Sequence, residues 1–171
     1  MIDLAALNGL PEDEAREALL ACCGSRRWAA AMAAHRPFAD LAAVEGAADE
    51  AWWALGADDW REAFAAHPRI GERAPGAGRA AAWSAREQAG TEDAAAEVRA
   101  ALARTNRDYE ARFGHLFIVC ASGKTPAEML ALLEARLGAD PRAELDTAAG
   151  EQAAITRLRL HRLLGEGQPP R

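Results

Sequence analysis

One stretch of the sequence, from His67 to Gly90, gathers side chains that could exchange protons with a small molecule. Imidazole titrates near neutrality, so His67 is suited to carrying a proton. Pro68 disfavours helical backbone at the residue before it, and a helix is therefore expected to end at His67. A loop rich in glycine and proline then leads to a second short segment around Glu87.

The second segment carries Ser84, Glu87 and Gln88, which stand at positions i, i+3 and i+4. On a helical turn these three side chains share one face. A hydroxyl, a carboxylate and an amide could then converge on the imidazole of His67. We therefore predict His67 and Glu87 as the catalytic pair and Ser84 and Gln88 as substrate-binding residues. The sequence leaves open which member of the pair is the acid and which is the base.

A second candidate region is the apolar run from His115 to Cys120, which is the one β-like run in the sequence and continues into Ala121. A lone strand-like run cannot pair its own backbone amide and carbonyl groups, so these groups need other partners. A substrate rich in amides is one such partner. The backbone of this run is therefore a candidate for contacting a substrate.

Arg159 is the candidate for binding a carboxylate or a ring carbonyl. Ile155, Arg159 and Leu163 fall on one helical stripe, which puts this guanidinium on an otherwise apolar face. Its planar fork matches the geometry of a carboxylate. The ordinary alternative is an arginine that extends from the edge of the core to solvent. Likewise, Arg69 and Glu72 could simply pair and tie the loop.

The two runs HPRIG at His67–Gly71 and EQAG at Glu87–Gly90 together resemble the 2-oxo-4-hydroxy-4-carboxy-5-ureidoimidazoline (OHCU) decarboxylases of uric acid degradation. The resemblance implies decarboxylation to (S)-allantoin and a homodimer. It also implies that the backbone of the FIVCA segment binds substrate, which predicts Ile118, Val119 and Ala121 as binding residues together with Pro68. It also implies no cofactor and no metal, because the ring C=N of the substrate can accept the electron pair. Further matching runs are CCGSRRW at Cys22–Trp28, RPF at Arg36–Phe38, FIVCA at Phe117–Ala121 and ITRLR at Ile155–Arg159.

The elements that must position these residues are expected to be helices, because alanine is abundant and β-branched residues are sparse. We predict an all-α, single-domain helical bundle of about seven to nine helices, with one short extended segment near the site. The domain is expected to cover residues 1–165 and to be followed by a disordered tail, 166–171. The helices are predicted at 11–23, 25–36, 40–56, 60–66, 92–112, 126–137 and 141–164.

Composition indicates which kinds of partner and which cellular compartment to expect. A formal net charge of −6 disfavours nucleic acid or an anionic membrane as the main partner. No apolar run is long enough to span a bilayer, and acids stand near the N-terminus where a signal peptide would carry bases. Cys22, Cys23 and Cys120 offer neither a disulfide framework nor a metal-binding spacing. We therefore expect a cytoplasmic protein that acts on a small molecule.

Two other functions fit the same sequence. The first is a helical binding module without chemistry, in which the tryptophan-rich region around residues 52–60 forms a groove for a partner. The second is a hydrolase of a cyclic ureide, with Glu87 activating water. Release of carbon dioxide separates the decarboxylase from the hydrolase, because hydrolysis opens a ring without losing carbon.

Overall fold

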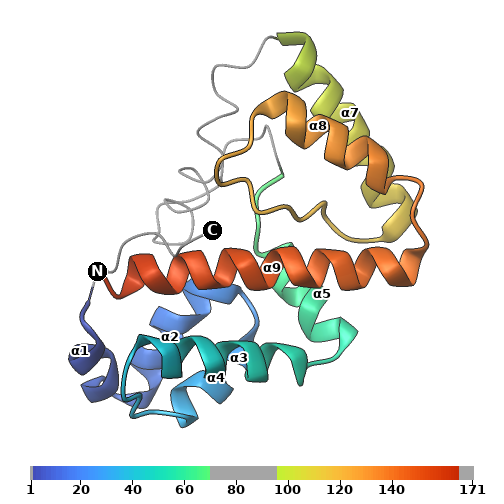
Figure 1. The fold of residues 1–171 in the computed structure, drawn as a ribbon. Helices are drawn as coiled ribbons and strands as arrows, with labels where there is room; N and C mark the ends of the chain where they lie inside the picture. Colours follow the sequence, from blue (N-terminus) through green and yellow to red (C-terminus); the bar gives the residue numbers. More distant parts are fainter. Residues whose placement is uncertain (1, 70–95, 166–171) are drawn as a thin grey trace. The chain divides into compact units, whose positions relative to one another are not determined.

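The computed structural model describes residues 2–69 and 96–165, and most of these residues lie in helices (Figure 1). Within these two ranges there are eight helices and no strand, which confirms the predicted all-α fold class. The chain divides into two compact units. The first is formed by residues up to Ala63 together with the chain from Gln152 onward, and the second runs from Phe64 to Glu151. The predicted single domain over 1–165 stays a prediction, and the predicted tail 166–171 lies outside the described residues.

Side-chain hydrogen bonds cap the start of three helices in the first unit. The side chains of Asp3, Ser25 and Asp40 each accept a hydrogen bond from the backbone N–H three residues on. Such caps satisfy N–H groups that have no partner inside the helix. This unit contains α1 (Leu4–Gly9), α2 (Glu12–Cys23), α3 (Arg26–Ala34), α4 (Leu41–Trp53), most of α5 (Ala57–Ala65) and the C-terminal part of α9 (Pro141–Leu163). Helix α1 was not predicted from the sequence.

The core of the first unit is built around two buried tryptophans. Trp28 and Trp52 are both at most 2% exposed, and the indole N–H of Trp28 donates to the carbonyl of Ala48 at 3.0 Å. Trp53, by contrast, is 51% exposed and meets Trp60 edge-on, with 5.8 Å between the ring centroids. The tryptophans of this region are therefore not all core residues.

The second unit contains α7 (Ala96–Phe113), α8 (Pro126–Arg136) and the first part of α9. The capping box predicted at the start of α8 is present, with Thr125 and Glu128 each bonding the backbone N–H of the other. Gly114, at φ +72°, follows the last residue of α7. Buried side chains from α7, α8 and the connection between them form one core cluster: Leu102, Tyr109, Phe117, Val119, Met129 and Leu133.

Candidate active site

His67 lies two residues after Ala65, the last residue of α5, close to the helix end predicted from the sequence. Its backbone N–H donates to the carbonyl of Phe64 at 3.1 Å, which closes the last turn, and both His67 and Pro68 are half-buried. Arg69 forms a bidentate ion pair with Glu110 of α7, with N–O distances of 2.7 and 2.9 Å. This pair fixes the chain just after Pro68 to the second unit, and it assigns Arg69 a partner other than the one considered from sequence.

Three of the predicted site residues, Ser84, Glu87 and Gln88, lie outside the described residues. The same holds for Glu72, the alternative partner of Arg69. The meeting of the His67 imidazole with the Glu87 carboxylate therefore stays a prediction.

The connection from α7 to α8, drawn in gold in Figure 1, carries Ile118, Val119 and Ala121. It has no strand partner among the described residues, in agreement with the expectation that its backbone must bond elsewhere. Ile118 and Val119 are 2% and 6% exposed, and Ala121 is half-buried. Side chains, rather than another strand, bond part of its backbone. The carbonyl of Ile118 accepts from Arg136 at 2.8 Å, and the N–H of Cys120 donates to Glu151 at 2.6 Å.

Arg136 belongs to a buried polar group that was not predicted from the sequence. Its guanidinium donates to the carboxylate of Glu144 at 2.8 Å and lies over the ring of Phe117, 4.7 Å from the centroid. The hydroxyl of Tyr109 donates to the same carboxylate. Burial and this hydrogen bond to Glu144 together raise the pKa of Tyr109. The available sequence signal was the short connection between helices, which places the end of α8 beside the first turn of α9.

Arg159 lies in the first unit, on the stripe predicted for it. Ile155, Arg159 and Leu163 are 4%, 3% and 0% exposed, so this arginine does not extend to solvent. The Cys23 thiol and the Thr156 side chain lie near it in the same unit. Burial raises the pKa of the Cys23 thiol to about 12, and the positive charge of Arg159 and a hydrogen bond to Thr156 act in the opposite direction. His67 and the 118–121 segment belong to the second unit, so their convergence with Arg159 stays a prediction.

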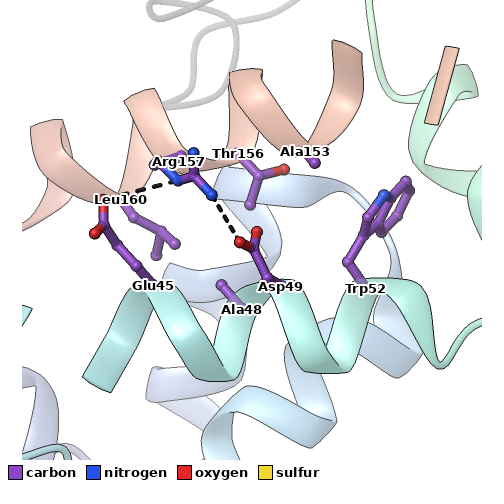
Figure 2. Close-up of a pocket in the computed structure, with 8 residues that line it drawn as sticks. All are labelled: Glu45, Ala48, Asp49, Trp52, Ala153, Thr156, Arg157 and Leu160. Carbon is purple, nitrogen blue, oxygen red and sulfur yellow. Dashed lines mark hydrogen bonds and ion pairs between the residues drawn. The ribbon is translucent and has the colours of Figure 1, made fainter. Parts of the chain in front are cut away.

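A pocket in the first unit lies between α4 and α9 and contains none of the predicted site residues (Figure 2). Arg157 spans it, pairing with Asp49 at 2.6 Å and with Glu45 at 3.8 Å. Glu45 also bonds the imidazole of His161 at 2.7 Å. Two carboxylates at this pocket therefore share one guanidinium. It is lined by Glu45, Ala48, Asp49, Trp52, Ala153, Thr156, Arg157 and Leu160.

In the part of the chain that the structure describes, no three His, Cys, Asp or Glu side chains are grouped so as to hold a metal ion. None of the helices described is long and apolar enough to cross a membrane.

Comparison with known proteins gives consistent results. A family model described as OHCU decarboxylase matches residues 8–161. The uric acid degradation bifunctional protein TTL of Arabidopsis thaliana is 38% identical over 149 residues, which are 85% of this chain and 46% of that protein. The OHCU decarboxylase of Bos taurus is 38% identical over 102 residues, 58% of this chain and 60% of that protein. The chain thus spans less than two thirds of the length of either relative.

A solved structure is also similar along most of both chains. The crystal structure of an OHCU decarboxylase in the presence of (S)-allantoin matches with a TM-score of 0.77 and 34% sequence identity. The match covers 88% of this chain and 99% of that one.

Proposed function

Because the chain belongs to the OHCU decarboxylase family, we propose that it converts OHCU to (S)-allantoin and carbon dioxide in uric acid degradation. The observation that carries the proposal is the match to an OHCU decarboxylase structure over 99% of that chain, at 34% identity. The motifs in this sequence support it, since the HPRIG, EQAG and FIVCA runs all occur in one chain.

The proposed reaction needs no cofactor, because the substrate itself accepts the electron pair. The bond between the ring carbon and the carboxylate breaks, and its electron pair moves toward the neighbouring C=N, whose nitrogen takes up a proton. The hydroxyl on the reacting carbon then becomes the carbonyl of the product as the neighbouring carbon gains a proton. The protein must orient the substrate, stabilise the displaced charge and deliver that proton to one face only.

Each predicted residue has a role in this scheme. His67 carries the proton, and Glu87 either orients the imidazole or accepts the proton of the substrate hydroxyl. Arg159 binds the carboxylate or a ring carbonyl through its planar fork. The ureido and ring amide groups are bound by Pro68, Ser84, Gln88 and the backbone of Ile118, Val119 and Ala121.

We propose further that the protein is a cytoplasmic homodimer. The dimer rests on the resemblance to the family. The compartment is supported by the three cysteines, Cys22, Cys23 and Cys120, none of which forms a disulfide. Sedimentation or light scattering of the purified chain tests the dimer directly.

The test of the activity is uric acid oxidation coupled to the hydrolase that acts on the first oxidation product, with and without this protein. The circular dichroism of allantoin reports its enantiomeric excess. We expect (S)-allantoin and carbon dioxide to form faster than in the background reaction. Racemic allantoin formed at the background rate would refute the decarboxylase, and ring opening without release of carbon dioxide would point to a hydrolase.

A further inference from the structure

One side of the segment from Ile118 to Ala121 is bonded by three charged side chains. Arg136 donates to the carbonyl of Ile118 at 2.8 Å, and Lys124 donates to the carbonyl of Cys120 at 2.7 Å. The carboxylate of Glu151 accepts from the N–H of Cys120 at 2.6 Å. All of these residues lie in the second unit.

The bonded groups follow an alternating pattern. In extended backbone, the N–H and C=O of one residue point to the same side, and those of the next residue to the other side. Ile118 and Cys120 are therefore expected to present their peptide groups to one side, where the three charged side chains bond them. The N–H and C=O of Val119 and the N–H of Ala121 form no hydrogen bond within residues 2–69 and 96–165.

We propose that Glu151 is a positioning residue, which fixes the Cys120 peptide so that the backbone groups of Val119 and Ala121 face the substrate. This inference rests on the proposed function. A bond from an N–H to a carboxylate is stronger than one between neutral groups, and Glu151 projects from a long helix rather than from a loop. Lys124 bonds the other polar group of the same residue, so both hydrogen-bonding groups of Cys120 are held from one side.

The experiment compares Glu151→Ala with Glu151→Gln and with Glu134→Ala, a matched change of an exposed glutamate on α8. Glu151→Ala leaves the Cys120 N–H without its acceptor, and we expect KM to rise roughly tenfold with little change in kcat. Glu151→Gln retains an acceptor oxygen and should restore KM to within about threefold of wild type. Glu134→Ala should leave both constants unchanged.

Hydrogen exchange of the peptide covering residues 115–124 provides a readout that does not depend on turnover. Glu151→Ala should accelerate exchange there, whereas exchange in α7 stays as in wild type. Lys124 is half-buried in the loop, and Lys124→Met removes the second side-chain hydrogen bond to Cys120. This variant should also raise KM, and it tests the inference even if Glu151→Ala is too unstable to assay.

The outcomes separate this inference from the proposed function. A wild-type protein without decarboxylation would overturn both. An active wild type, with Glu151→Ala and Lys124→Met both showing the KM of Glu134→Ala, would overturn the positioning role alone. Loss of kcat in Glu151→Gln, at unchanged KM and unchanged exchange, would also overturn it, because the carboxylate would then act through its charge on the chemical step.

Discussion

Replacing Glu144 by alanine should strongly destabilise the second unit. The side chains of Arg136 and Glu144 are 12% and 1% exposed, and the carboxylate also accepts from the buried hydroxyl of Tyr109. Removing one partner of a buried ion pair leaves the other charge without compensation, which costs about 3–5 kcal/mol. Because Arg136 keeps some access to water and its bond to the Ile118 carbonyl, we expect the lower end, about 3 kcal/mol.

Thermal and urea unfolding, followed by far-ultraviolet circular dichroism, measure this decrease in the free energy of unfolding. In a chain of this size, about 3 kcal/mol corresponds to a decrease in Tm of roughly 6–12 °C. Glu144→Gln keeps the side-chain volume and an acceptor for Tyr109, so its free energy of unfolding should decrease less than that of Glu144→Ala. The exposed Glu134→Ala is the control and should stay within about 0.5 kcal/mol of wild type.

The reasoning fails if Glu144→Ala unfolds within about 1 kcal/mol of wild type, a change expected for an exposed pair. It also fails if Glu144→Ala and Glu134→Ala give the same Tm. Either result would mean that the carboxylate is well solvated in solution and that Arg136 does not depend on it.

Three further predictions concern the site and the thiols. His67→Ala should keep the helical circular dichroism spectrum and lose the stereoselective formation of allantoin; undiminished turnover would remove His67 from its role. Arg159→Ala should raise KM roughly 10–100-fold, since a hydrogen bond to a charged group contributes about 1.5–3 kcal/mol, and unchanged KM and kcat would exclude substrate binding by this residue. Because burial raises the pKa of Cys23 to about 12, its thiol should react with a disulfide reagent only upon unfolding, whereas the half-buried Cys120 should react in the native protein. Mass spectrometry of the labelled peptides distinguishes the two, and native labelling of Cys23 ahead of Cys120 would contradict this ordering.

Some features of the site were predictable because they depend on interactions within a few residues. Pro68 restricts the backbone before it, and the turn after α5 does close at His67. The stripe containing Arg159 follows from helical periodicity, and Ile155, Arg159 and Leu163 are all buried as it predicts. The meeting of His67 with Glu87 stays a prediction.

The sequence by itself determined the all-α class, the capping box of α8 and the ends of most helices, since each depends on local hydrogen bonds and on the helical repeat. It also indicated that the 115–121 run needed partners outside a ladder. Only the tertiary structure decided which partners these are: the N–H of Cys120 meets a carboxylate 31 residues away, and Arg69 meets one 41 residues away. Such contacts depend on how distant helices pack, and a polar side chain carries no local signal of the distant backbone group that it will bond.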